Sequence, residues 1–525
     1  MAKSSLGKYL RTIRYLNKKQ IFYKIFYLLK NLLPFKKKYN NSNFVINKKF
    51  SFNNFIINNQ SYLSKNNFRF LNINKKFTSI DWNFMDFGKL WNYNLCYFDF
   101  LNQKKIYVDD FNEIIVNFFK FKNHISGYES YTISLRNVNL IKYISKHNIK
   151  DEFLNYKLYN SFLRLKDNLE YHILGNHLLE NAFSLLFGSI YFNDDSFFEI
   201  SEKILLDQLD EQILNDGAHF ELSPMYHCIT LHKVLDSINL LRSNEIFNSK
   251  NLEKKLEVKA VKMLSWLSQI SFKNNEIPHF NDSTFGIAPK LSDLFNYSKK
   301  LNIVIDSIKL SDSGYRKYNG DKYEIVVDYG SIGPTYLPGH GHSDTFNFEL
   351  HCHNMPIIVD TGISTYENNS IRHIERSTVS HNTLMVDEKN QSEVWSSFRV
   401  GQRAEVKKIY EDDNSIIGIH DGYRKKNVFH QRSFHCNKNE IIIEDIIKHI
   451  NIHNLKSYLH FAPHCKIELK DNQLKINGFI KINFFNYKIL EKDRYNYCLG
   501  YNKKITAEKI VGTPSNNSKI HISIL

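Results

Sequence analysis

The spacing of apolar residues divides the chain into a helical part and a later strand-forming part. Between about residues 89 and 301, apolar side chains recur at positions i, i+3, i+4 and i+7, as in NHLLENAFSLLFGSIYF. After about residue 309 the period becomes two, as in YEIVVDYG and KIELKDNQLKI, with turn residues between the segments. This pattern predicts an array of α-helices followed by an all-β portion, most simply a sandwich.

The length indicates more than one hydrophobic core, because 525 residues exceed what a single core usually organises. We predict a basic N-terminal helix and polar connector over residues 1–80. A helical domain should follow over residues 81–308, and an antiparallel β domain over residues 309–525.

The N-terminal stretch KYLRTIRYLNKKQIFYKIFYLLKNLLPFKKK is both basic and apolar. Lys24 and Lys30 interrupt its apolar run, and no small-residue cleavage site follows. The stretch is therefore a poor signal peptide and a poor membrane span, which favours the cytoplasm or the cytoplasmic membrane face over the periplasm. Two alternatives remain: a helix lying on anionic lipid, or a helix packed on its own domain with a solvated basic face.

The net charge of +16 predicts an affinity for anionic polymers. No zinc-finger spacing, RNA-binding signature or P-loop is present, so a nucleic-acid partner is not expected. The six cysteines are scattered without a CxxC motif and should be reduced and buried. The sequence makes no prediction of oligomeric state.

The segment from Gly339 to Gly362 gathers the residues with the most chemistry. His340, His342 and Asp344 are two residues apart, so an extended backbone would place all three side chains on one face. Alternation from Phe346 onward predicts a half-buried strand. Two imidazoles and a carboxylate on one face could present a divalent metal or a general base.

Two helical motifs carry further polar side chains. In GNHLLE, His177 and Glu180 are three residues apart and share a helix face, with Asn176 at the helix start. In DGAHFELSPMYH, a Ser-Pro pair leads into a helix whose first turns hold Tyr226. A weaker cluster, PHFND, ends at Asp282. Asn176 could also serve only as a helix cap, and Tyr226 could merely pack against a neighbour.

Together these segments resemble the heparinase II/III-like family of polysaccharide lyases. The matching segments, in order, are LWNYNLCYFDFL, SYTISLRNVN, NHLLENAFSLLFG, DGAHFELSPMYH, HFNDSTFGIAP, GHGHSDTFNFEL, ERSTVSHNTLMVD and SEVWSSFRVG. The resemblance implies an incomplete α/α toroid followed by an antiparallel β-sandwich. It also implies cleavage of an acidic, uronate-containing polysaccharide by β-elimination.

The resemblance implies roles for individual residues. Asn176 and His177 would bind the uronate carboxylate, Tyr226 would be the catalytic acid, and His340 would take the C5 proton. Glu180, Arg136 and Tyr366 are predicted to bind substrate. His342, Asp360 and His381 would hold a divalent metal, usually zinc, with Asp344 as an alternative ligand to Asp360.

β-Elimination requires these residue types. The carboxylate must be neutralised by hydrogen-bond donors, a base must remove the C5 proton, and an acid must protonate the leaving oxygen. A uronyl C5-epimerase is an alternative, because it uses the same proton abstraction. A non-catalytic glycan-binding component of surface-polysaccharide assembly is a second alternative, although binding alone would not need these four catalytic side chains together.

Overall fold

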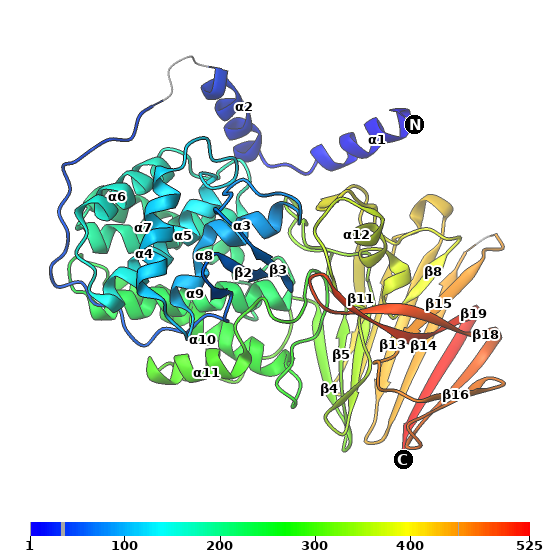
Figure 1. The fold of residues 1–525 in the computed structure, drawn as a ribbon. Coiled ribbons are helices and arrows are strands. Elements are labelled where there is room, and N and C mark those ends of the chain that lie inside the picture. Colours follow the sequence, from blue (N-terminus) through cyan, green and yellow to red (C-terminus); the bar gives the residue numbers. More distant parts are fainter. Residues whose placement is uncertain (1, 33–36, 450) are drawn as a thin grey trace.

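The computed structural model describes residues 2–32, 37–449 and 451–525, so residues 33–36 of the basic N-terminal stretch lie outside the described residues. The helical part and the β part are distinct bodies that lie side by side, with the two N-terminal helices above them (Figure 1). The periodicity prediction is confirmed: α-helices dominate up to Lys300, and strands dominate from Tyr315 onward.

Eleven α-helices of the described part precede the main sheets. Their bounds are α1 (Ala2–Ile13), α2 (Lys18–Leu32), α3 (Lys89–Tyr97), α4 (Val108–Lys120), α5 (Ser130–His147), α6 (Glu152–Lys166), α7 (Gly175–Phe192), α8 (Asp195–Gln212), α9 (Pro224–Ser243), α10 (Lys250–Ile270) and α11 (Leu291–Lys300). The connector forms a small antiparallel sheet of β1 (Tyr62–Ser64), β2 (Asn67–Phe70) and β3 (Ile73–Lys76). One hydrophobic core runs through this sheet and helices α3 to α11.

The β part contains two principal antiparallel sheets. The smaller has the order β4 (Tyr315–Asn319), β5 (Tyr323–Asp328), β6 (Phe348–Cys352), β7 (Met355–Ile358). The larger has the order β11 (Val406–Glu411), β12 (Ser415–His420), β13 (Phe429–Cys436), β14 (Glu440–Lys448), β19 (Lys503–Ile524), β18 (Ile480–Gly500), β17 (Gln473–Ile476), β16 (Ile467–Lys470), with β15 (Leu455–His460) joining β19 to β8 (Leu384–Val386). Both sheets contribute side chains to one core.

Two elements of the β part follow the sequence only in part. The expected strand at His340 is a loop, and β6 begins at Phe348 because Phe346 has a left-handed backbone, φ 66°. The prediction of a half-buried strand was wrong, because every residue of β6 is buried. The polar side of β6 packs on the helical part: Glu349 accepts a hydrogen bond from the His279 backbone, and His351 stacks on Phe272.

Two segments tie the helical part to the β part. Helix α2 contacts the helical part, whereas α1 contacts the β part through an Arg11–Glu393 ion pair of 2.6 Å. From the other end of the chain, the β18–β19 hairpin reaches across at its tip. Its Asn502 side chain donates to the Leu71 carbonyl in the small connector sheet. These bridges complement the direct packing of β4–β6 on the helices.

The turn that begins the DGAHFELSPMYH motif is anchored at the junction of the two parts. Asp216 accepts hydrogen bonds from the backbone of Ser311 and Ser313 and from the Ser313 hydroxyl. Gly217, the next residue, has φ +87°, and a Cβ there would lie 2.1 Å from the Lys262 carbonyl oxygen. A glycine is therefore required for both its backbone angle and its close approach to α10.

We expect Gly217→Ala to lower the free energy of unfolding by about 3 kcal/mol, through a strained backbone and a clash with α10. Gly286→Ala is the matched control, because Gly286 has φ +78° but no heavy atom within 4 Å of its Cβ position. The control should lose only about 1 kcal/mol. Urea denaturation measures both values, and equal losses would contradict the close approach.

Candidate active site

The N-terminus of α7 presents Asn176 and His177. Gly175 begins the helix with φ +56°, and a Cβ there would lie 2.4 Å from the Leu337 side chain, so the loop before His340 packs directly on this turn. The Asn176 backbone and side-chain amides both donate to Glu221, at 3.1 and 3.0 Å. Because a side-chain amide carries two hydrogens, one donor of Asn176 remains for another acceptor.

His177 is paired with a buried carboxylate. Its Nδ1 lies 3.0 Å from Glu170, whose other oxygen accepts a hydrogen bond from Asn181. Burial would lower the pKa of His177, but the Glu170 carboxylate outweighs it and raises that pKa above its usual value. The half-exposed imidazole is therefore biased toward its cationic form, which suits an anionic ligand.

Tyr226 is held in the first turn of α9. Ser223 caps this helix by accepting a hydrogen bond from the Tyr226 backbone, and Pro224 occupies the first helical position. The Tyr226 ring stacks on His340 with centroids 3.9 Å apart, and its hydroxyl lies 3.2 Å from that of Tyr366. Burial raises the pKa of Tyr226 above its usual value, so the phenol is protonated at neutral pH.

Asp282 is the hub of the site. One of its oxygens lies 2.8 Å from His340 Nδ1, and the other lies 2.9 Å from His342 Nε2. The Arg372 guanidinium binds the same carboxylate through two nitrogens. Burial alone would raise the pKa of Asp282, but Arg372 and the two histidines hold it well below its usual range. The two imidazoles of the HxHxD motif do converge, but on this carboxylate.

The structure thus brings the four predicted catalytic residues to one place. Glu221 accepts a hydrogen bond from the Asn176 side chain, and one of its carboxylate oxygens lies 3.4 Å from His340 Nε2. His177 follows Asn176 in the chain, and Tyr226 stacks on His340. Asn176, His177 and Tyr226 come from the helical part, whereas His340 comes from the β part.

Of the predicted substrate-binding residues, only Tyr366 joins this cluster. Arg136 is 0% exposed, donates to the Gly127 carbonyl and lies over the Phe118 ring. Glu180 is buried on α7 and pairs with Lys233 at 3.4 Å. Within the described part of the chain, neither side chain forms a hydrogen bond or ion pair with the Asp282 cluster, and a role of either in substrate binding stays a prediction.

The three predicted metal ligands are buried, and one of them, His342, contacts Asp282. His381 Nδ1 lies 2.7 Å from Asp360, an arrangement in which Asp360 fixes the ring and leaves Nε2 free. Three buried atoms here have no hydrogen-bond partner: His342 Nδ1, His381 Nε2 and one oxygen of Asp344. Imidazole and carboxylate donors suit zinc. Within the described residues, however, no three His, Cys, Asp or Glu side chains are arranged around one point as a metal requires.

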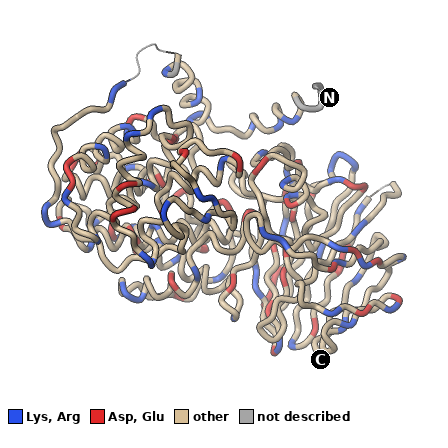
Figure 2. Tube along the Cα trace, viewed as in Figure 1, with Lys and Arg blue, Asp and Glu red and all other residues tan. Residues whose placement is uncertain are grey.

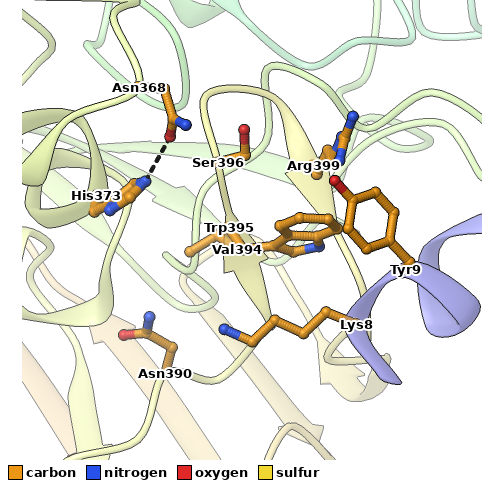
Figure 3. Close-up of a pocket in the computed structure, with 9 residues that line it drawn as sticks. All are labelled: Lys8, Tyr9, Asn368, His373, Asn390, Val394, Trp395, Ser396 and Arg399. Atoms are coloured by element: carbon orange, nitrogen blue, oxygen red, sulfur yellow. Dashed lines mark hydrogen bonds between the residues drawn. The ribbon is translucent and has the colours of Figure 1, made fainter. Parts of the chain in front are cut away.

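A cavity of about 640 Å³ lies between α1 and the segments of the β part that carry His373, Asn390 and Trp395 (Figure 3). Tyr9 packs edge-on against Trp395 at 4.8 Å, and the Arg399 guanidinium lies 4.7 Å from the Tyr9 ring. Lys8 reaches into the same space. A second cavity of about 350 Å³ shares Tyr9 and Arg399 and extends to Gly339, next to His340. Aromatic and cationic side chains therefore line a path that leads away from His340 through the two cavities.

Sequence reasoning missed several residues that orient the cluster. Glu221 lies inside a motif that was recognised, but its role depends on a contact with His340 more than one hundred residues away. Asp282 ended the weakest of the sequence clusters. Glu170 and Arg372 had no signal in the sequence, because a single charged residue is meaningful only when its partner is known.

Two family models cover most of the chain. "Heparinase II/III N-terminus" matches residues 130–302, and "Heparinase II/III-like, C-terminal" matches residues 304–524. The chain belongs to the heparinase II/III-like family. The resemblance seen in the sequence is thereby confirmed, and the break between the two matches coincides with the change from helices to strands.

Curated relatives of this family member include two heparin-sulfate lyases. The enzyme of Bacteroides stercoris is 23% identical over 311 residues, which is 53% of this chain and 44% of that protein. The enzyme of Pedobacter heparinus is 25% identical over 321 residues, which is 54% of this chain and 46% of that protein. The matched region therefore spans less than half of each relative.

Solved structures share the fold of this family member. A crystal structure of heparinase III has a TM-score of 0.66 at 15% identity and covers 86% of this chain and 80% of that chain. A mutant of the heparan sulfate lyase HepC from Pedobacter heparinus has a TM-score of 0.58 at 17% identity, covering 88% and 81%. The likeness supports a shared multidomain fold with a helical N-terminal region and a β-rich C-terminal region.

We expect Glu170→Gln to lower the pKa of His177, because the substitution removes the carboxylate that raises it. The ion pair stabilises the fold fully below the usual imidazole pKa of about 6.5, and this stabilisation is lost as the pH rises through the higher folded-state value. Titration of His177 by NMR measures the shift. Glu388→Gln, at an exposed and remote position, is the control; an unchanged His177 pKa in Glu170→Gln would contradict the pairing.

Proposed function

We propose that this protein is a polysaccharide lyase that cleaves an acidic, uronate-containing polysaccharide by β-elimination at the Asp282 cluster, between an incomplete α/α toroid and an antiparallel β-sandwich. One observation carries the proposal: a protonated phenol, Tyr226, stacks at 3.9 Å on an imidazole, His340, that a carboxylate orients. The names of the curated relatives and the family membership support the same chemistry.

Asn176 and His177 are the proposed carboxylate-binding pair. Glu221 fixes the Asn176 amide and leaves one of its hydrogens free, and Glu170 favours the cationic form of His177. Hydrogen bonds from Asn176 and His177 would partly neutralise the negative charge of a uronate carboxylate bound here. That change lowers the energy of the carbanion-like species formed when the adjacent C5 proton leaves.

His340 is the proposed base. Asp282 accepts the Nδ1 hydrogen in the tautomer required, which leaves the Nε2 lone pair for the C5 proton. This tautomer is assigned from the carboxylate contact, because the Asp282 pKa is held well below its usual range. As His340 takes the proton, the ionised carboxylate stabilises the imidazolium that forms.

Tyr226 is the proposed acid. In the reaction, the C5–H pair of electrons becomes the C4–C5 double bond, the C4–O bond breaks, and the Tyr226 proton passes to the leaving oxygen. His340 then releases the C5 proton to solvent, and the Tyr226 phenolate takes up a proton from solvent. The raised pKa of Tyr226 makes it a donor at neutral pH and disfavours a role as resting-state base.

The arrangement favours elimination over C5 epimerisation. An epimerase must return a proton to the face of the sugar opposite to the one from which it was removed. Tyr226 and His340 are stacked on each other, so they approach a bound ring from the same side. The adjoining cavities, with Lys8, Arg399 and Trp395, offer cations and an aromatic face to the rest of an acidic polymer.

We predict that wild-type protein will generate new unsaturated ends, absorbing in the near ultraviolet, from at least one member of a panel of acidic polysaccharides. Tyr226→Phe should lower turnover at least about 100-fold while folding and polymer binding persist, because only the proton donor is removed. Tyr410→Phe, at an exposed position on β11, is the matched control. Wild-type rates for Tyr226→Phe would reject the proposed acid, and epimerised but uncleaved polymer would reject the lyase.

We also propose a divalent metal, zinc in the first instance, held by His342, His381 and either Asp360 or Asp344. The unpartnered atoms of His342, His381 and Asp344 support the site, and Asp360 already receives a hydrogen bond from His381. When bound, the ion would supply fixed positive charge that stiffens the loop carrying His340. Binding of the ion would require these side chains to move together, because they are not arranged around one point among the described residues.

Elemental analysis of protein purified without a metal-affinity tag should find close to one equivalent of metal. His381→Ala should lose it, and chelation should lower the melting temperature of wild type but not of this variant. Asp344→Asn and Asp360→Asn, compared side by side, identify which carboxylate is the ligand. Metal-free wild-type protein with an unchanged melting temperature would refute the site.

A further inference from the structure

Helix α2 turns its apolar stripe toward solvent. Phe22 is 62% exposed and Leu29 is 60% exposed, although both belong to the most apolar face of the helix. The other exposed apolar residues of α2 are Ile21, Ile25, Phe26, Leu28 and Leu32. They recur at helical spacing, so they form one continuous stripe. Monomeric soluble proteins rarely leave such a stripe uncovered.

The side of α2 that faces the protein is the polar and aromatic one. Gln20, 3% exposed, donates to the Ile173 carbonyl, and the Tyr27 hydroxyl donates to the Leu169 carbonyl. Tyr23 stacks on Tyr171 at 4.6 Å, and Lys30 donates to the Asp167 carbonyl. These contacts fix the rotation of the helix about its axis. The apolar stripe of α2 therefore faces solvent because these contacts hold the opposite side of the helix against the protein.

Helix α1 repeats the arrangement on the β part. Thr12 accepts a hydrogen bond from the Trp395 indole, and Arg11 pairs with Glu393. Leu6, Leu10 and Ile13 remain exposed. Both helices lie outside the two domain bodies, along the upper edge in Figure 1.

The charge around these helices has one sign. Residues 1–80 contain no Asp or Glu, and the first acidic residue of the chain is Asp81. Lys18, Lys24 and Arg14 are exposed beside the apolar stripe, and the tube in Figure 2 carries blue but no red along the described part of this region. An apolar stripe with flanking cations matches an anionic lipid surface, in which acyl chains receive the stripe and phosphates receive the cations.

We propose that α1 and α2 form an interfacial arm that binds this protein to the surface of an anionic bilayer. None of the described helices has the length and continuous apolarity needed to cross a bilayer, so the arm lies in the interface. A second copy of the chain is a poorer partner for the stripe, because apposed arms would bring lysines and arginines together with no acid to pair them. This inference is independent of the proposed lyase activity.

The experiment is flotation of the full-length protein with vesicles of phosphatidylcholine alone or mixed equally with phosphatidylglycerol. We expect binding to the mixed vesicles, weakened by salt, and little binding to phosphatidylcholine alone. The variant F22S/F26S/L29S should bind at least about 10-fold more weakly, because it removes apolar side chains that would enter the acyl region. It should fold normally, since all three side chains are exposed in the free protein.

The matched control is F485S/I489S/I452S, which removes three exposed apolar side chains of the β part. It should bind the mixed vesicles as wild type does. A second variant, K18E/K24E, should lose the preference for phosphatidylglycerol. The proposal is overturned if wild type fails to float with mixed vesicles, if the α2 variant floats equally well, or if the α2 substitutions instead dissolve a dimer of a protein that binds no vesicle.

Discussion

The site depends on one buried carboxylate. Asp282 is fully removed from water, and an ionised carboxylate is tolerated there only because Arg372 and two imidazoles satisfy it. Asp282 belongs to the helical part, whereas all three partners belong to the β part. The same ionic cluster therefore joins the two parts and sets the orientation of His340. Its cost in desolvation is repaid only when both parts are packed together.

A second carboxylate plays a related role from the opposite side. Glu221 lies in the turn before α9, accepts hydrogen bonds from the backbone and side-chain amides of Asn176, and approaches His340 at Nε2. Reactive side chains from separate elements thus share acceptors that fix their direction before any ligand arrives. Such pre-organisation lowers the reorganisation needed during a reaction, which is where fixed dipoles and charges contribute most.

The sequence allowed much of this to be predicted, for identifiable reasons. A period of 3.6 followed by a period of two located the helices and strands, because burial on one face imposes those spacings locally. Asn176, His177, Tyr226 and His340 could be predicted because they lie in motifs dense in polar residues. Their orienting partners, such as Glu170 and Arg372, were not visible, because a contact across many residues leaves no local spacing. The buried polar face of β6 was missed for the same reason: its cover comes from the helical part.

The order of synthesis constrains when the site can assemble, and the β18–β19 hairpin is its last element to be made. Synthesis proceeds from the N-terminus, so the helical part leaves the ribosome well before the hairpin whose tip contacts Leu71 and packs Tyr501 against Tyr366. The partners of Asp282 emerge earlier than the hairpin but still after the helical part, so Asp282 has neither the imidazoles nor Arg372 to pair with until the segment from His340 to Arg372 has been made. The nascent helical part must therefore keep this acid hydrated or protonated. Ionisation in a dry environment becomes possible only after Arg372 has emerged, and the packing of Tyr501 on Tyr366 completes the surroundings of the cluster near the end of translation.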